Sequence, residues 1–520
     1  MSRVRTLSAL SIILVLFYSI CASELRSQIL PLWGGLEPGS YAVGFDTIEK
    51  YDYTRTIRPK RDYFGQTLTG ERARPIQICI WYPAEKTEDA KSMILGEYIF
   101  PYPNDGDFFE FVSAIQDREI AYLFTILNND RGAVLDLLSV KVGAIHKAPS
   151  SKGSFPLIIH TPDLGRGAAE NFILCEYLAS HGFIVAATHS VGAFALNAEL
   201  NAADRETQID DAGFLLSLMR DYPNVNPERI GALGYRAGGS VSLILGARNS
   251  NIDIVASLDG LYLYKQHFEF TRQNPFFNQE KMNLPLLTIY SNDDPALDFS
   301  LLDSLVYSHK YSCGISDLTG GELTGYGILP SFNIYSEEKQ PSPFNKGYEI
   351  ACQYLYHFFN GHLNGDEKSK KFIGDPPDKT DRVTYSYTKG ETPPPSPEQF
   401  MNMLAEKGVE TTHEIYNKYK HTGRSFFSEA NFNSIGYRMF QGGDIDNAIL
   451  IFEMNADAYP DSPNSWDSLG EVCEAAGRTE EAIKYLKKVL EILPSDTTTD
   501  ARFKEQIKNH AQEAIQRLEK

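Results

Sequence analysis

The run R-I-G-A-L-G-Y-R-A-G-G at residues 229–239 is the feature that most restricts the fold of this chain. Apolar residues lead up to Gly234, and a helix-like stretch begins at Gly238. Small residues around one large side chain are typical of a sharp turn from a strand into a helix, because the backbone there tolerates only small neighbours. The run therefore predicts a buried strand, a tight turn with Arg236 at its tip, and a following helix.

Strand-like and helix-like segments alternate through most of the chain. Short apolar or β-branched runs bounded by turn residues predict strands, and stretches with helical periodicity between them predict helices. This alternation indicates a mostly parallel sheet covered on both faces, which is the α/β class. The expected strands are 75–82, 155–160, 183–188, 229–233, 254–258, 284–290 and 310–318, and the expected helices include 168–180, 207–221, 238–248 and 347–361.

The chain of 520 residues is too long for one ordinary core, so we expect more than one domain. We place an α/β domain at 35–365. Within it, residues 85–148 contain helical stretches and are expected to form an insertion or a lid, part of which covers a sheet edge. Residues 366–397 include the prolines at 393–395 and predict an extended linker, within which a short strand at 383–387 can dock on the α/β body.

Residues 398–520 contain an internal repeat with a period of 34 residues. Small residues let two antiparallel helices approach, a large apolar residue fills the space between them, and proline ends the second helix. The recurring pairs are Gly436 and Gly470, Ala448 and Ala482, Phe452 and Leu486, and Pro460 and Pro494. This pattern resembles the tetratricopeptide repeat. The resemblance implies a helical array that either offers a groove to a partner protein, packs on its own chain, or drives dimerisation.

The N-terminal segment has the features of an export signal. Arg3 and Arg5 precede an apolar stretch from Leu7 to Ile20, and small residues follow. Because that stretch is short for a membrane span, we expect residues 1–23 to be removed and the protein to be secreted or periplasmic. Retention as a membrane anchor and lipidation at Cys21 stay open as alternatives.

The charge of the chain disfavours some partners. Its formal net charge is -19 at pH 7, whereas nucleic acids and anionic membranes need a basic face. We therefore expect no nucleic-acid partner. Five cysteines follow the signal segment without the spacing of a disulfide framework or a metal site, so we expect buried free thiols and neither a metal nor a cofactor.

The α/β part resembles the α/β-hydrolases of the platelet-activating-factor acetylhydrolase and dienelactone hydrolase group. In that fold the sharp turn reads G-x-S-x-G and carries a nucleophilic serine. The resemblance extends from about residue 39 to residue 365. It is carried by I-C-I-W-Y-P-A at 78–84, F-P-L-I-I-H-T-P-D-L-G at 155–165, L-A-S-H-G at 178–182, the run at 229–239 and A-S-L-D-G at 256–260.

Two of the three catalytic residues that this resemblance implies are absent. An arginine stays protonated in proteins and cannot attack a carbonyl carbon, so serine-esterase chemistry is not expected. Pro162–Asp163 stands where the family has H-G before its oxyanion residue. The corresponding positions are Arg236 for the nucleophile, Asp259 for the acid, Leu323 for the histidine, the backbone N–H groups of Leu164 and Ala237 for the oxyanion hole, and Gly234 and Gly238 for the turn.

Two roles for Arg236 stay open. A bidentate ion pair with Asp259 would satisfy both groups in place of the triad. Alternatively, Arg236 faces an open pocket and binds the carboxylate or phosphate of an anionic small molecule or lipid, next to the oxyanion N–H groups.

The leading interpretation is an exported hydrolase-like protein that binds a ligand, a protein, or both. The alternative is a carboxylic-ester or lipid acyl hydrolase with another constellation, such as water activated by His160 or His189 with Asp163. Asp293 and Asp294 offer a second place for an acid, but we favour a role as turn formers before a proline. Ser240 is a poor substitute nucleophile because it lies inside the helix, to which its hydroxyl is expected to bond.

Overall fold

A computed structural model describes residues 32–57, 73–87, 90–100, 106–193, 198–279, 282–331, 343–376, 382–420 and 427–520. The contacts within the chain divide it into two compact units, residues 1–391 and 392–520. The expected signal segment 1–23 lies outside the described residues. Among the helices described, none is both long and apolar enough to cross a membrane.

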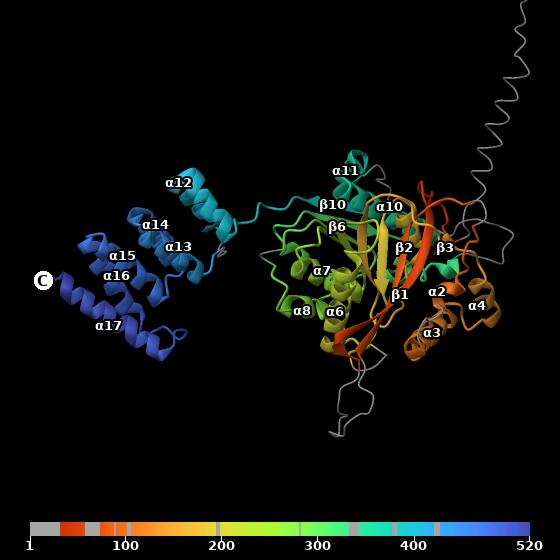
Figure 1. Ribbon diagram of the computed structural model, residues 1–520, viewed down its shortest axis with the longest axis horizontal. Coiled ribbons are helices and arrows are strands. Elements are labelled where there is room, and N and C mark those ends of the chain that lie inside the picture. The colour runs from red at the N-terminus through yellow and green to blue at the C-terminus, as the bar shows by residue number, and fades with distance from the viewer. Residues whose placement is uncertain are drawn as a thin grey trace, which may run out of the picture. The chain divides into compact units, whose positions relative to one another are not determined.

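The first unit is built on one ten-stranded sheet with the order β10-β9-β8-β7-β6-β4-β5-β2-β1-β3 (Figure 1). Only β2 and β10 run against the other strands. A mostly parallel sheet with helices confirms the α/β class. The strands are β1 Ala42–Thr56, β2 Ala73–Ala84, β3 Ala144–His146, β4 Phe155–Thr161, β5 Ile184–Thr188, β6 Val225–Tyr235, β7 Ile254–Leu258, β8 Leu286–Ser291, β9 Lys310–Ile315 and β10 Val383–Thr388.

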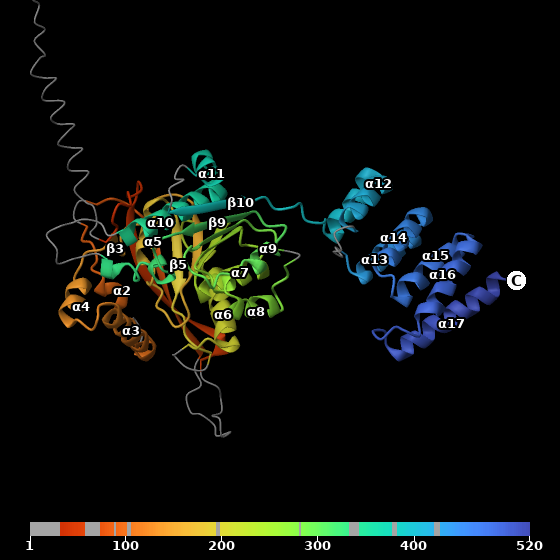
Figure 2. The same ribbon diagram turned by 180° about the vertical axis from the view of Figure 1, so that it is seen from behind.

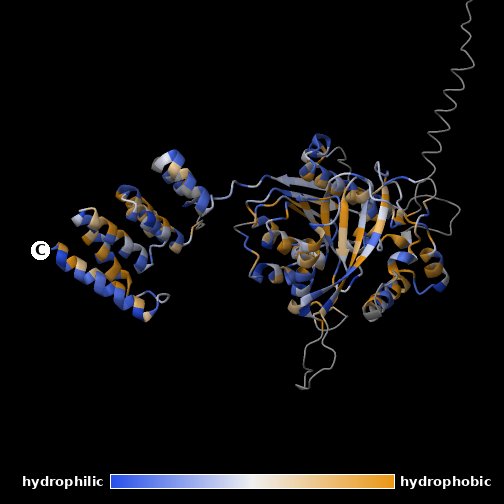
Figure 3. Cartoon of the chain, viewed as in Figure 1, coloured by the Kyte–Doolittle hydropathy of each residue, from blue (hydrophilic) through white to orange (hydrophobic). Residues whose placement is uncertain are grey.

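Helices cover both faces of this sheet (Figures 1 and 2). Successive side chains of a strand point to opposite faces, so β4 sends Ile158 into one apolar core and Leu157 and Ile159 into the other. Hydrophobic residues are accordingly concentrated along the strands (Figure 3). The first core is covered by α5 Phe172–Ser180, α10 Pro343–Leu363 and α11 Glu367–Gly374, and the second by α6 Ala202–Met219, α7 Ala237–Arg248, α8 Lys265–Gln273 and α9 Ser300–Asp303.

The chain has a topological switch point at the carboxyl ends of β4 and β6. These strands are neighbours, but β4 leads into α5 on one face and β6 leads into α7 on the other face. Open α/β sheets bind ligands at such a switch point. The loop after β4, which contains Asp163, and the turn after β6, which contains Arg236, both begin there.

Residues 85–148, expected as an insertion or a lid, contain α2 Gly96–Ile99, α3 Gly106–Ile126, α4 Arg131–Leu138 and β3. Strand β3 pairs with β1 at the sheet edge. From α3, Glu119 accepts a hydrogen bond from the backbone of Gly167 at 3.1 Å, in the loop after β4. This segment therefore covers an edge of the sheet and also contacts the loop after β4.

Within the expected linker 366–397, the predicted docked strand at 383–387 is confirmed, but an extended linker over the residues before it is wrong. The segment contains α11 and β10, and β10 pairs with the edge strand β9 along its whole length. The unpaired backbone groups of an edge strand are satisfied by such an addition, and Val383 and Tyr385 pack against the first core. The five mature cysteines of the prediction, Cys79, Cys175, Cys313, Cys352 and Cys473, are buried free thiols as expected.

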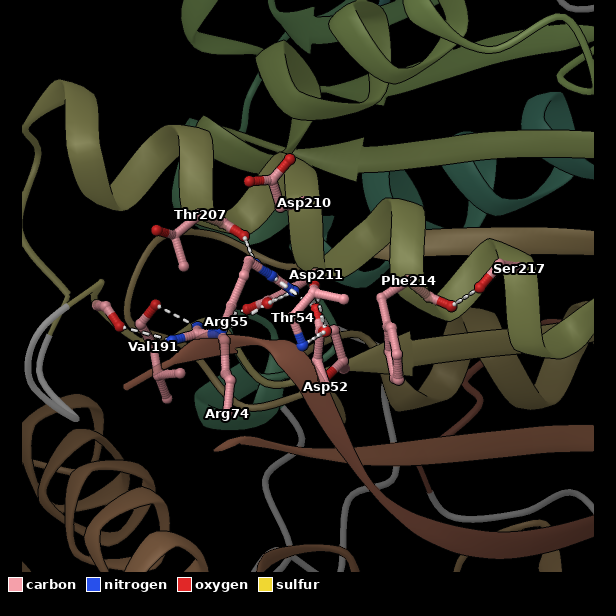
Figure 4. Close-up of polar contacts among 12 residues, drawn as sticks. Asp52, Thr54, Arg55, Arg74, Val191, Thr207, Asp210, Asp211, Phe214 and Ser217 are labelled. Carbon is pink, nitrogen blue, oxygen red and sulfur yellow. Dashed lines mark hydrogen bonds and ion pairs between the residues drawn. The ribbon is translucent and has the colours of Figure 1, made fainter. Parts of the chain in front are cut away.

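A buried cluster of ion pairs fixes α6 against β1 and β2 (Figure 4). Arg74 of β2 donates through Nε and Nη2 to the two carboxylate oxygens of Asp211, at 2.7 and 2.6 Å. Its other N–H groups donate to the carbonyls of Val191 and Gly192, and Arg55 of β1 lies 2.9 Å from Asp211. Two parallel hydrogen bonds from one guanidinium to one carboxylate fix the relative orientation of the two groups. The pair of Arg74 with Asp211 therefore holds α6 in one orientation.

The second unit is entirely helical. In both copies of the repeat, the glycine meets the large apolar residue: a Cβ on Gly436 would lie 2.6 Å from the Phe452 ring, and one on Gly470 would lie 2.8 Å from the Leu486 side chain. Only glycine permits this approach of the paired helices. The helices are α12 Pro397–Lys420, interrupted at Gly408, α13 Glu429–Gln441, α14 Ile445–Ala458, α15 Pro463–Ala475, α16 Thr479–Ile492 and α17 Ala501–Leu518.

We predict that residues 392–520 fold alone. Three apolar clusters, each formed within this unit, supply its core. The isolated fragment should show a helical circular dichroism spectrum and a cooperative thermal transition. Gly470→Leu should abolish that transition. Gly477→Ala, at a turn with open space around it but a φ of +74°, should cost only about 1–2 kcal/mol of backbone strain. A fragment without helical signal would show that the repeats depend on the first unit.

Candidate functional site

The candidate site lies where β4, β6 and β7 end. Asp163 follows β4, Arg236 follows β6 and Asp259 follows β7. Because these strands are parallel neighbours, their carboxyl ends meet at one edge of the sheet, and the three charged side chains converge there.

The turn at Arg236 has the strained geometry that its sequence predicts. Arg236 adopts φ 48° and ψ -109°, a conformation that L-residues rarely adopt. A Cβ on Gly234 would lie 2.0 Å from the carbonyl oxygen of Gly238, and one on Gly238 would lie 2.1 Å from that of Thr161. Both glycines are therefore required for this turn.

Arg236 bridges two carboxylates. Its Nη1 lies 3.2 Å from Asp259 Oδ2, and its Nε lies 3.5 Å from Asp163 Oδ2. The Arg236 side chain is 39% exposed, whereas that of Asp259 is 1% exposed. Elements of both expected roles are present: the arginine is paired with Asp259, though not in a bidentate manner, and it is open to solvent.

The two N–H groups expected to form an oxyanion hole are both occupied by Asp163. Its Oδ1 accepts hydrogen bonds from Leu164 N at 2.8 Å and from Ala237 N at 3.1 Å. A carboxylate of the chain itself therefore stands where these donors would hold the oxygen of a reacting ester. The sequence analysis missed this role, although Asp163 directly precedes Leu164 at the place where the family has glycine.

Asp259 is held by Tyr264 as well as by Arg236. The Tyr264 hydroxyl donates to Asp259 Oδ1 at 2.7 Å and lies 3.1 Å from Asp294 Oδ2. Burial raises the pKa of Asp259, and the bonds from Tyr264 and Arg236 oppose that rise. Asp294 accepts the N–H of Ala296 two residues on, as a turn former does, whereas Asp293 accepts the N–H of Asp317 in the loop after β9.

Leu323, the position of the family's histidine, is fully buried in an apolar core. It ends the 3-10 helix Gly320–Leu323, which begins against Asp259: a Cβ on Gly320 would lie 2.1 Å from Asp259 Oδ2. The backbone of Gly320 thus fills the space beside this carboxylate.

A second charged cluster, also missed by the sequence analysis, supports the loop that contains Asp163. Glu170 Oε2 accepts a hydrogen bond from Asp163 N at 2.9 Å, and Arg166 Nε lies 3.4 Å from Glu170 Oε1. The Arg166 guanidinium stacks 3.2 Å above the ring of Tyr122. Burial and the nearby Asp163 carboxylate raise the pKa of Glu170 to about 8.

The two histidines of the alternative constellation are buried in structural roles. His189 Nδ1 accepts the Ala168 N–H at 3.0 Å, and its Nε2 lies 3.0 Å from Gln77 Oε1. His160 lies 3.3 Å from the carbonyl of Leu233, and burial lowers its pKa to about 4. Within the described residues, neither histidine bonds to Asp163, so the expected water-activating constellation is not assembled.

Ser240 is buried as expected, but the prediction that its hydroxyl bonds to the helix is wrong. Its Oγ has no hydrogen-bond partner in the described chain.

The cavity that His189 and Glu119 line has a volume of about 10 Å³, which is room for about one water molecule. Among the residues that the structure places, no group of three His, Cys, Asp or Glu side chains is arranged to hold a metal ion.

Comparison with known proteins gives only a distant structural likeness. No family model and no curated protein matches the sequence. One matching solved structure is a ferulic acid esterase from Streptomyces cinnamoneus, with 18% identity over 68% of this chain and 98% of that chain and a TM-score of 0.46. The hydrolase-like fold of the first unit therefore rests on its strand order and its strand-turn-helix geometry.

We predict energetic coupling between Arg236 and Asp259. In a double-mutant cycle with Arg236→Leu and Asp259→Asn, chemical denaturation should give a coupling of about 1–2 kcal/mol, because one partner is buried and the other is partly solvated. The matched surface pair Arg248–Asp210, at 2.9 Å, should give less than about 1 kcal/mol. Coupling indistinguishable from zero would contradict a stabilising pair.

We also predict a pH-dependent effect of His189. Burial lowers its pKa to about 3, so protonation below its unfolded value near 6.5 favours the unfolded state. Relative to the wild type, His189→Asn should therefore gain about 1.4 kcal/mol of unfolding free energy per pH unit as the pH falls from 6.5 to 4.5. A flat difference for His189→Asn would contradict its burial as a neutral ring.

Proposed function

We propose that the first unit is a hydrolase-like frame that binds a ligand without serine-esterase activity. The observation that carries this proposal is the position of Asp163 Oδ1 on both N–H groups of Leu164 and Ala237. An ester oxygen can use these donors only after the carboxylate has left them. Arg236, which replaces the nucleophile, is also tied to the same carboxylate.

The charge balance supports this proposal. An oxyanion hole accelerates hydrolysis because its donors are free to meet charge that develops in the transition state. Here a carboxylate of the chain already satisfies the donors, and it faces Arg236. The site is thus a completed salt bridge rather than a set of unpaired donors.

We propose further that the second unit is a tetratricopeptide-like module for a protein partner. Side-chain bonds join α13, α15 and α17 in one layer: Tyr437 to Glu471 at 2.8 Å, Asp467 to His510 at 2.8 Å, and Glu474 to Arg517 at 2.8 Å. A polar, hydrogen-bonded helix layer is suited to a partner with charged or amide groups.

The proposed ligand is an anionic small molecule or lipid, because Arg236 is partly open to solvent. The proposed location is outside the cytoplasm, based on the signal-like residues at 1–23. Deleting residues 392–520 should remove the protein partner and leave ligand binding unchanged.

The test is esterase activity of the full chain. The wild type should not react with a fluorophosphonate probe, and its kcat/KM on p-nitrophenyl acetate should stay below about 10⁴ M⁻¹s⁻¹. Arg236→Ser should not restore turnover, because Leu323 supplies no base and Asp163 still fills the N–H pair. Covalent labelling of the wild type, lost in Ser240→Ala but kept in Ser242→Ala, would instead establish an enzyme with a relocated nucleophile.

A further inference from the structure

Arg205 is a buried cation that lacks an anion. It lies in α6 and is 6% exposed, and its Nε is fully buried with no hydrogen-bond partner. In the described chain no carboxylate lies within ion-pair distance of its guanidinium, which only stacks on Phe270 of α8, 4.7 Å from the ring centre. By contrast, Arg74 and Arg166 are paired with acids.

A buried acceptor without a partner lies one helical turn from Arg205. Gln208 is 3% exposed, and its Nε2 donates to the carbonyl of Pro162 at 2.7 Å. Because a carbonyl can only accept, the amide nitrogen must face it, and Oε1 is left buried and unpaired. Residues three apart share a helix face, so a donor and an acceptor stand together beside the loop that contains Asp163.

Arg236, His267 and the Asp163 carboxylate lie within electrostatic range of Arg205. The charge of Asp163 acts on Arg205, although the two do not form an ion pair. Burial lowers the pKa of His267 in α8, and both Arg205 and Arg236 lower it further, so the two arginines and this histidine lie within electrostatic range of one another. The outer nitrogens of Arg205 make no hydrogen bond in the described chain but are not fully buried, and Arg236 is 39% exposed. Solvent therefore reaches part of both arginine side chains at this point.

A buried charge is unfavourable unless an opposite charge compensates it. A water molecule could bond to both Arg205 Nε and Gln208 Oε1, but it would leave the charge uncompensated. An anion that also carries a hydroxyl meets every requirement: its charge pairs with the guanidinium, and its hydroxyl donates to Gln208 Oε1.

We propose that Arg205 and Gln208 form a binding site for a small anion with a hydroxyl group, beside Arg236. A hydroxycarboxylate and a hydrogen phosphate share this chemistry. The site rests on the proposed ligand-binding role of the frame and gives that role a ligand class. The buried ion pairs of Arg74 with Asp211, one turn beyond Gln208, hold this face of α6 in place before a ligand arrives (Figure 4).

The test is thermal unfolding of the full chain with sodium glycolate, acetate, phosphate or chloride at equal ionic strength. Glycolate and acetate differ by the hydroxyl that Gln208 would accept. Glycolate should raise the melting temperature of the wild type more than acetate does, and chloride should have the least effect. A response to phosphate instead of glycolate would support the same site and assign its ligand as a phosphate.

Arg205→Met should weaken glycolate or phosphate binding about tenfold or more, since it removes a charge-assisted bond. Without ligand this variant should melt at or above the wild-type temperature, because an uncompensated buried charge is removed. Gln208→Leu should erase the difference between glycolate and acetate. The control Arg248→Met, whose arginine also stacks on a phenylalanine but lies on the surface, should leave both responses unchanged.

Two results would overturn the site. One is a wild type that responds to all four salts alike, and the other is an undiminished glycolate response in Arg205→Met. Either result leaves the esterase assays unaffected, so a failure of this site is distinguishable from a failure of the proposed non-catalytic function. If Arg205→Met does not fold, Arg205→Lys provides the second variant, since it keeps the charge and loses the planar edge of the guanidinium.

Discussion

The hydrogen bonds from two backbone N–H groups to one carboxylate oxygen of Asp163 determine what this site can do. They are available because the strained turn at Arg236 brings Ala237 N beside the loop after β4. In a serine hydrolase the same donors stay free for the transition state. Here a charge of the chain itself satisfies them, and Arg236 balances that charge. The turn thus supports a salt bridge that Arg236 makes from its tip.

Other parts of the first unit hold Asp163, Arg236 and Asp259 in place. The parallel strands β4, β6 and β7 place the three charged residues at one edge. The Glu170 carboxylate accepts a hydrogen bond from Asp163 N, and the Tyr264 hydroxyl donates one to Asp259. Hydrogen bonds and ion pairs therefore connect the polar groups at the ends of β4, β6 and β7. Arg205 Nε, Gln208 Oε1, His160 Nε2 and Ser240 Oγ are buried here without a hydrogen-bond partner in the described chain. Of these four groups only Arg205 carries a charge, which is why Arg205 and its neighbour Gln208 indicate a ligand.

Much of the fold could be predicted from the sequence, because it depends on local patterns. The run at 229–239 predicts the turn, and the 34-residue period predicts which glycine meets which large apolar residue. The site was only partly predictable. The partnership of Arg236 with Asp259 followed from a family resemblance, but the position of the Asp163 carboxylate depends on side-chain rotamers across three loops. The docking of a strand at 383–387 was predicted, but its partner β9 and the helix α11 before it were not, because the flanking prolines dominate the composition of that segment.

The central claim is that the Asp163 carboxylate occupies the N–H pair of Leu164 and Ala237. Amide proton shifts of these two residues, measured by NMR on protein labelled with ¹⁵N at leucine and alanine, test it most directly. A charge-assisted bond moves an amide proton downfield, and Asp163→Asn removes that charge. Both resonances should therefore move upfield in Asp163→Asn, while the amide of Ala256 in the neighbouring strand stays in place. Unchanged Leu164 and Ala237 resonances would show that the N–H pair is free, and would contradict the account.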